Sequence, residues 1–285
     1  HQAIIRQLRA HADRLGLPAV VMLFEPQPRE YFSPDEAPSR LMPFREKVET
    51  LAELGVDRVL CIRFNIEFSR LSAQAFADDV LLRGLGVKHL VVGDDFHFGN
   101  DRCGDFAFLS RFGETHGFGV ENTHTFELAG ERVSSTRVRS ALEQGNFPMA
   151  SALMGREFFI EGRVTHGDKR GRTINVPTAN ILLRRKKTPL SGVYAVEVDG
   201  ASPQRLFGVC NVGIRPTVNG LLPRLEVHLL DFNGDLYSRR LKVYFRRKIR
   251  DEKKFASFDE LKQAIYQDIE TGRAYFSNTP SNSLK

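Results

Sequence analysis

The chain has 285 residues, of which 41% are hydrophobic and 10% aromatic, so it can fill two globular cores and is not a disordered tail. No apolar run approaches the roughly 20 residues of a membrane span, and the net charge of +6 suits nucleotides, phosphates or nucleic acid as well as it suits a mildly basic solvated surface. The three widely separated cysteines suggest neither a disulfide framework nor a CxxC metal site, and they favour a reducing, cytoplasmic compartment.

The first half of the chain alternates helical and strand-like patterns. Apolar residues at helical spacing predict a helix over 4–15, and the apolar run 19–24 follows as a predicted strand. The same order recurs twice more, with helices expected at 44–54 and 72–84 and strands at 58–62 and 89–92. This alternation indicates a parallel sheet with helices on its faces, which binds ligands at the carboxyl ends of its strands.

Two segments of the first half have the composition of ligand loops. Val92–Arg102 follows a predicted strand and combines glycines with aromatic residues that could accept a flat ring system. A tight loop whose phenylalanines enter the core explains these residues equally well. Ser134–Arg139 opens a predicted helix, where unpaired N–H groups and the positive end of the helix dipole favour an anion. Ordinary N-capping by Ser134 or Ser135 is the alternative, and both can hold at once.

After about Arg156 the pattern changes to a period of two residues. Apolar and polar residues alternate over 194–198, 225–229 and 241–245, and Asp-Gly and Asn-Gly pairs mark hairpin turns between them. This predicts an antiparallel sheet that can close into a small barrel. A capping box at Ser257–Glu260 opens one C-terminal helix.

Two neighbouring segments of the second half could bind a metal-bound nucleotide. Gly162–Arg172 holds glycines and cations that could turn N–H groups and positive charge toward phosphate, although a plain basic hairpin turn has the same composition. Pro177–Asn180 follows it. In an extended chain Thr178 and Asn180 face the same side, so their oxygens could converge on Mg²⁺. Two polar side chains facing solvent are the alternative.

Together with four later segments, these motifs resemble the riboflavin kinase domain over nearly all of 156–275. The further segments are Gly192–Tyr194, Asn211–Thr217, Leu225–Phe232 and Ile249–Glu252. One departure is Thr173–Val176, where the family usually has Leu-Gly-Phe before the proline.

The resemblance implies a six-stranded barrel in which ATP and Mg²⁺ phosphorylate the 5′-hydroxyl of riboflavin. It implies that Thr178 and Asn180 hold Mg²⁺, that Glu226 is the general base, and that Arg250 lies near the flavin. Without the resemblance, Glu226 reads as an exposed strand carboxylate, and His228 as its structural neighbour. The residues expected at the ATP phosphates are Gly162, Gly167, Lys169, Gly171 and Arg172.

The first half, from His1 to about Arg156, resembles the FMN adenylyltransferase domain of bacterial FAD synthetases, a member of the nucleotidyltransferase superfamily. Its two loop segments carry the resemblance, together with 24–32 and 51–59. His1 resembles the last histidine of the family's His-x-Gly-His motif, so the preceding strand, turn and first histidine are expected to be missing and adenylylation to be weak. A second departure is Gln27, where the family usually has histidine.

This resemblance implies functions for seven residues of the first half. His1 would steady charge on the transferred and leaving phosphates. The ATP phosphates are assigned to Ser135, Thr136 and Arg137, and the FMN and adenine region to Asp95, Phe96 and Asn100.

The sequence therefore predicts an α/β nucleotidyltransferase domain with a Rossmann-like parallel sheet over 1–155, and an antiparallel six-stranded β-barrel with a C-terminal helix over 156–285. The predicted enzyme converts riboflavin to FMN and FMN to FAD with ATP and Mg²⁺, without nucleic-acid or membrane partners. A riboflavin kinase with a degenerate adenylyltransferase domain is the first alternative. The net charge also motivates a flavin-sensing or nucleic-acid-binding regulator, but the basic residues do not form one long stripe.

Overall fold

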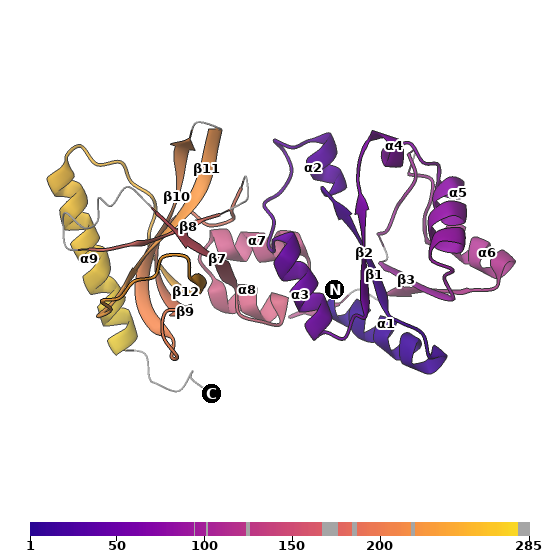
Figure 1. Cartoon of the computed structure of the whole chain (residues 1–285), viewed down its shortest axis with the longest axis horizontal. Helices are drawn as coiled ribbons and strands as arrows, with labels where there is room; N and C mark the ends of the chain where they lie inside the picture. Colours follow the sequence, from indigo (N-terminus) through magenta and orange to yellow (C-terminus); the bar gives the residue numbers. More distant parts are fainter. Residues whose placement is uncertain are drawn as a thin grey trace. The chain divides into compact units, whose positions relative to one another are not determined.

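The protein was analysed as a computed structural model, in which the chain divides into two compact units (Figure 1). One unit comprises residues 1–38 and 42–132, and the other comprises 39–41 and 133–285. The structure describes residues 1–93, 95–100, 102–123, 126–166, 176–183, 187–217 and 220–278, with only the backbone at 214–217 and 220–222. No helix in these ranges is long and apolar enough to cross a membrane.

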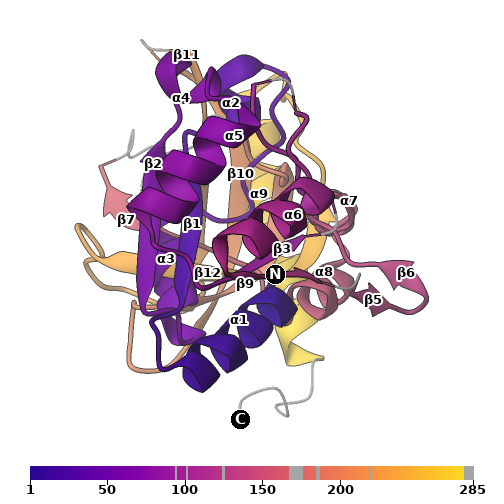
Figure 2. The same cartoon turned by 90° about the vertical axis from the view of Figure 1, so that its right-hand side faces the viewer.

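The first unit contains two pairs of parallel strands. Strand β1 (Val20–Glu25) pairs with β2 (Arg58–Arg63), and β3 (His89–Gly93) pairs with β4 (Gly119–Thr123). The predicted alternation of helix and strand thus produces parallel strands. Within the described residues these strands form two separate pairs. A hairpin of two short strands, β5 (Glu127–Leu128) and β6 (Glu131–Arg132), extends from this unit (Figure 2).

The helices of this unit separate the strand-forming segments. They are α1 (Gln2–Leu15), α2 (Pro28–Phe32), α3 (Phe44–Glu53), α4 (Ile66–Ser69), α5 (Ala73–Ala75), the π-helix η1 (Phe76–Gly84) and α6 (Phe106–His116). Two core clusters use alternate residues of β1. Val21 and Leu23 pack with Ile5 of α1 and Leu51 of α3, whereas Met22 packs against the cluster of η1 and α6. Helices therefore cover both faces of the β1–β2 pair.

The second unit is built on a closed six-stranded barrel, as the alternating pattern predicted. Its neighbouring strands are antiparallel, in the order β10-β11-β8-β7-β12-β9. The strands are β7 (Phe159–Thr165), β8 (Ala179–Leu182), β9 (Gly192–Asp199), β10 (Leu206–Thr217), β11 (Gly220–Leu229) and β12 (Arg240–Arg250). Every second residue points inward, so that Leu225 and Val227 are 0% and 1% exposed.

Three helices belong to the same unit as the barrel. The C-terminal α9 (Phe258–Ser277) begins at the predicted capping position, where the Ser257 Oγ accepts the backbone N–H of Glu260 at 3.2 Å. Helices α7 (Ser135–Glu143) and α8 (Phe147–Met154) precede β7. Phe147 of α8 stacks on Phe245 of β12 with 5.9 Å between ring centroids, so this helix packs on the barrel. The domain boundary after residue 155 stays a prediction.

Gly192, the first residue of β9, is required by its backbone conformation. Its φ is 116°, and a Cβ there would overlap the carbonyl oxygen of Arg250. We expect Gly192→Ala to lower the free energy of unfolding of this unit by about 2 kcal/mol. Tyrosine fluorescence in a urea titration measures this change, because only Tyr31 of the six tyrosines lies in the first unit and the protein has no tryptophan.

The control for this substitution is Gly155→Ala at the end of α8, where φ is 67°. Alanine tolerates this left-handed helical region at a cost of about 1 kcal/mol. Equal losses for the two variants would contradict a special requirement for glycine at residue 192.

Candidate active site

A row of polar residues crosses four adjacent strands on the outside of the barrel. Thr165 of β7 lies opposite Asn180 of β8, Asn180 opposite Glu226 of β11, and Glu226 opposite Asn211 of β10. Directly opposed residues share a face of the sheet. Since the neighbours of Glu226 along β11 point inward, this row faces outward. The strand register therefore brings together a hydroxyl, two amides and one carboxylate.

Hydrogen bonds from β7 and β11 hold the segment 177–180 between these two strands. The Asn180 amide donates to the Thr178 carbonyl at 3.4 Å, and the Thr165 hydroxyl donates to the Asn180 carbonyl at 3.3 Å. A ring nitrogen of His228 lies 2.9 Å from the Pro177 carbonyl. His228 thus helps to position the Thr178 segment, which agrees with its interpretation as a structural neighbour of Glu226.

A pocket of about 220 Å³ opens at one end of this row. It is lined by Thr165, His166, Asn180, Ile181, Leu182 and Arg224. Arg224 lies two residues before Glu226, so its side chain is on the same outer face. Its Nε is buried, with no hydrogen-bond partner among the residues that the structure describes. Such a buried N–H suits an anionic oxygen.

The predicted phosphate loop is described only at its start. Gly162 lies on β7 at an inward position, where a Cβ would overlap the Ile181 side chain, so close packing of β7 on β8 accounts for this glycine. The other residues assigned to ATP phosphates lie outside the described residues: Gly167, Lys169, Gly171 and Arg172. The phosphate contacts of this loop stay predictions.

Arg250, which was expected near the flavin, fastens β12 to α9. Its guanidinium donates two hydrogen bonds of 2.8 Å to the Asp268 carboxylate, and Asp268 is 6% exposed. The Arg250 Cζ also lies 5.5 Å from the centre of the Phe255 ring. A pocket of about 350 Å³ adjoins Phe255 and is lined by Lys253, Phe255, Glu260, Gln263, Ala264 and Gln267. Arg250 therefore lies next to this pocket, because it contacts Phe255 of the pocket lining.

Three polar residues of this region had no predicted function, namely Thr165, Asn211 and Arg224. Asn211 was noted only within a family motif, and its Nδ2 and the Glu252 Oε1 would both contact a Cβ placed at Gly213. Alternation along each strand shows which face a residue occupies, but the pairing of strands could not be read from it.

In the first unit, the loop after β3 uses one of its aromatic residues for the core. Phe98 is 8% exposed and packs with Phe76, and Phe96 stacks on it with 5.4 Å between centroids. The alternative that the phenylalanines enter the core therefore holds for Phe98, and Phe96 packs partly buried against the same cluster. The Asp95 carboxylate lies 3.3 Å from Arg132, and the backbone N–H of Asn100 donates to the Leu71 carbonyl. Asp95, Phe96 and Asn100 are thus held on one loop.

The remaining predicted phosphate residues begin a helix. Ser134 is the N-cap of α7, and its Oγ accepts the backbone N–H of Arg137 at 3.2 Å, which confirms the capping alternative. Ser135, Thr136 and Arg137 form the first turn of α7, in the second unit. This turn carries the positive end of the helix dipole.

The other two positions discussed for adenylyl transfer also lie at helix starts. His1, the N-cap residue of α1, lies in the first unit. Gln27 is the N-cap residue of α2, and its backbone N–H donates to the Glu30 carboxylate at 3.1 Å. A helix start explains the place of Gln27, and the effect of its side chain on adenylylation stays a prediction.

Comparison with known proteins finds relatives along the whole chain. A family model described as FAD synthetase matches residues 1–137, and one described as riboflavin kinase matches residues 154–276. The chain is 52% identical over 279 residues to a bifunctional riboflavin kinase/FMN adenylyltransferase of Escherichia coli strain K12, covering 98% of this chain and 89% of that protein. It is 54% identical over 275 residues to the Pseudomonas fluorescens protein of the same name, covering 96% and 88%.

A solved structure is similar as well. A crystal structure described as a macrolide-efflux protein from Streptococcus pneumoniae matches with a TM-score of 0.77 and 32% identity, over 96% of this chain and 89% of that chain. The likeness therefore covers both units.

Proposed function

We propose, because the chain belongs to the family of bifunctional riboflavin kinase/FMN adenylyltransferases, that it makes FAD in two ATP-dependent steps. Riboflavin is phosphorylated to FMN, and FMN is adenylylated to FAD. The observation that carries this proposal is the identity of 52% over 98% of the chain. Its substrates are small molecules. We also propose a cytoplasmic location, which the cysteine content indicates.

For the kinase step, we assign the general base to Glu226. The 5′-hydroxyl of riboflavin must lose its proton as its oxygen attacks the γ-phosphorus of ATP, and an oriented carboxylate can accept that proton. The register of the barrel supports this assignment, because Glu226 lies directly opposite Asn180 on β8. Asn211 on the other side of Glu226 supplies a neutral amide that can orient the hydroxyl.

Neutral oxygen donors beside Glu226 fit a magnesium ion. The Thr178 hydroxyl and the Asn180 amide oxygen would hold Mg²⁺, leaving its charge to be balanced by the triphosphate. When bound there, Mg²⁺ would neutralise charge that develops on the phosphates. The pocket at Thr165 and Asn180 would receive the nucleotide phosphates, with the buried Arg224 Nε–H as one donor. The flavin ring would use the Phe255 pocket in front of Arg250.

For the adenylyl step, we assign the ATP phosphates to the first turn of α7. The N–H groups of Ser135 and Thr136 and the Arg137 side chain favour anionic oxygens there. In the first unit, Asp95, Phe96 and Asn100 would contact FMN and adenine. His1 would steady charge on the transferred and leaving phosphates as FMN attacks the α-phosphorus of ATP.

A chromatographic assay tests the two activities separately. Riboflavin with ATP and Mg²⁺ should yield FMN and then FAD, and FMN with ATP should yield FAD directly. FMN formation without FAD in either reaction would favour the kinase-only alternative. Formation of neither FMN nor FAD from riboflavin would contradict the kinase assignment.

Arg137→Ala should separate the two steps. Loss of one charge-assisted hydrogen bond to phosphate costs roughly 1.5–3 kcal/mol, so we expect FAD formation from FMN to fall about 10- to 100-fold. Riboflavin phosphorylation should stay within about twofold, because the kinase residues lie on the barrel. Arg45→Ala is the control, since the Arg45 side chain is 72% exposed and pairs with Glu49. An equal loss of both activities in the Arg137 variant would contradict the assignment.

A further inference from the structure

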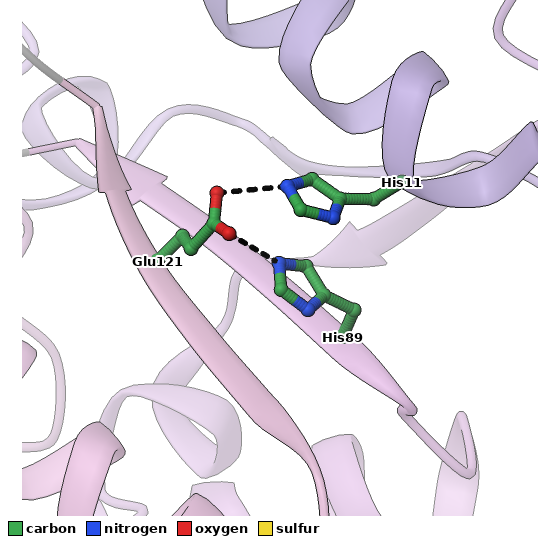
Figure 3. Close-up of side chains that lie close together, drawn as sticks. All are labelled: His11, His89 and Glu121. Atoms are coloured by element: carbon green, nitrogen blue, oxygen red, sulfur yellow. Dashed lines mark hydrogen bonds and ion pairs between the residues drawn. The ribbon is translucent and has the colours of Figure 1, made fainter. Parts of the chain in front are cut away.

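Two histidines and a glutamate from three separate segments of the first unit meet at one point. Figure 3 shows His11 of α1 and His89 of β3 with their rings facing the Glu121 carboxylate of β4. The His11 Nε2 lies 2.8 Å from the Glu121 Oε2, and the His89 Nε2 lies 3.7 Å from the Glu121 Oε1. All three candidate ligand atoms lie within 4.8 Å of one another. None of these residues belongs to the proposed kinase or adenylyltransferase machinery.

The two imidazoles are largely removed from water. The side chains of His11 and His89 are 11% and 13% exposed, and their rings stack with 3.9 Å between centroids and 16° between planes. The His89 Nε2 is buried and has no hydrogen-bond partner in the part of the chain that the structure describes. Burying a ring nitrogen without a hydrogen bond costs desolvation free energy. A further group that binds between this nitrogen and the carboxylate would offset that cost.

The chemistry of the three side chains suits a metal cation. Imidazole nitrogens and carboxylate oxygens are common metal ligands in proteins. Gln7 also donates a hydrogen bond of 2.7 Å to the Glu121 Oε2, which holds this carboxylate in place. The three side chains therefore supply the donor atoms of a metal site.

The ring position of His89 also depends on its neighbour across the strand pair. His89 lies directly opposite Gly119 of β4, and a Cβ at Gly119 would come within 2.6 Å of the His89 Nδ1. Only glycine leaves room for the ring in this orientation. The site is therefore built by the β3–β4 pair as well as by α1.

We propose that His11, His89 and Glu121 bind one divalent transition-metal ion, with Zn²⁺ the best fit. Bonds of about 2.0–2.2 Å to a tetrahedral Zn²⁺ place ligand atoms roughly 3.3 Å apart. The nitrogen–oxygen distances of 2.8 and 3.7 Å lie on either side of that value, so small side-chain rotations complete the site. Two imidazoles and one carboxylate leave a fourth position for water. The ion would join α1 to both strands of the β3–β4 pair.

Arg14 competes with the metal. Its guanidinium lies 2.7 Å from the His11 Nδ1 and can only donate, so that nitrogen accepts and the Nε2 carries the ring proton. Metal binding at the Nε2 moves this proton to the Nδ1 through solvent, without net proton release. Arg14 must then turn away from the ring. Arg14→Gln should therefore tighten metal binding, by about tenfold if it removes one competing hydrogen bond of roughly 1.4 kcal/mol.

Equilibrium dialysis of chelator-treated protein against Zn²⁺, and titration with Co²⁺ followed by its visible spectrum, test the proposal. We expect one ion per chain and a four-coordinate Co²⁺ spectrum. A thiolate charge-transfer band should be absent, because such a band would implicate the exposed Cys61 or Cys103 as ligands. His11→Ala, His89→Gln and Glu121→Gln should each weaken binding by about 100-fold. His116→Ala is the control, because the His116 ring hydrogen-bonds the Phe112 carbonyl and stacks on the Phe112 ring within its own helix, α6.

Two outcomes would overturn the proposal. One is the absence of stoichiometric binding by the native chain, which would leave a hydrogen-bonded cluster only. The other is binding that survives all three ligand substitutions. The Arg14 variant guards against misfolding as an explanation, because a gain of affinity cannot come from a damaged fold. Both activities are measured alongside, so failure of this site and failure of the proposed enzymatic function are distinguishable.

Discussion

Replacing Glu226 with glutamine should lower kcat for riboflavin phosphorylation by about 10²- to 10⁴-fold. Glutamine keeps the size of the side chain and its hydrogen-bonding capacity, but it cannot accept the proton of the 5′-hydroxyl at neutral pH. Glu226 points outward beside Asn180 and Asn211, so an amide is tolerated at this position and the barrel should fold normally. Steady-state kinetics with saturating ATP and Mg²⁺ measure the change.

The same variant supplies its own internal control. The KM for ATP should change little, because the carboxylate acts on the hydroxyl, and FAD formation from FMN should be unaffected. Glu270→Gln on the exposed side of α9 controls for loss of one negative charge in the same unit. A kcat within about threefold of the native value would remove Glu226 as the general base, since even the weakest general catalysts contribute about 100-fold.

Glu197→Gln should produce the largest loss of stability in the barrel. Glu197 of β9 is 7% exposed, and it accepts hydrogen bonds from Arg205 at 3.2 Å and from Arg246 of β12 at 2.7 Å. Burial alone would lower the pKa of both guanidiniums, but the carboxylates of Glu157 and Glu197 raise it. Glutamine at this position leaves Glu157 as the carboxylate shared by the two largely buried guanidiniums, so the positive charge is balanced less well and we expect the free energy of unfolding to fall by about 3 kcal/mol.

Urea titration followed by tyrosine fluorescence measures this loss. The matched control is Glu161→Gln, because Glu161 of β7 pairs at 2.7 Å with Arg240, whose side chain is 42% exposed. The Glu161 side chain is 14% exposed, but the solvated Arg240 guanidinium limits the contribution of this pair to about 1 kcal/mol. Losses of similar size in the two variants would show that burial of the Glu197 network adds nothing.

The same network should respond to acid. Burial alone would raise the pKa of Glu157, but the Arg246 and Arg205 guanidiniums lower it below its usual value of 4.5. A carboxyl whose pKa is lower in the folded state contributes stability above its unfolded pKa and loses that contribution as the pH falls through the folded value. The stability of Glu157→Gln should therefore depend less on pH below about 4.5 than that of the native chain.

Local patterns predicted several elements of both units because each pattern reports a short-range preference. The alternation over 194–198, 225–229 and 241–245 became β9, β11 and β12, since every second side chain of a barrel strand faces the core. The capping box at Ser257 predicted the start of α9 for the same reason, as its hydrogen bond spans only three residues. These signals require no knowledge of distant parts of the chain.

The sequence by itself determined the helix–strand alternation of the first half, the period of two in the second half and the family motifs. Only the tertiary structure decided which residues meet. The register that sets Glu226 between Asn180 and Asn211, and the meeting of His11, His89 and Glu121, join residues that lie far apart along the chain. A residue's own neighbours determine its face, but its partner depends on how strands pair and helices pack, which the whole core settles at once.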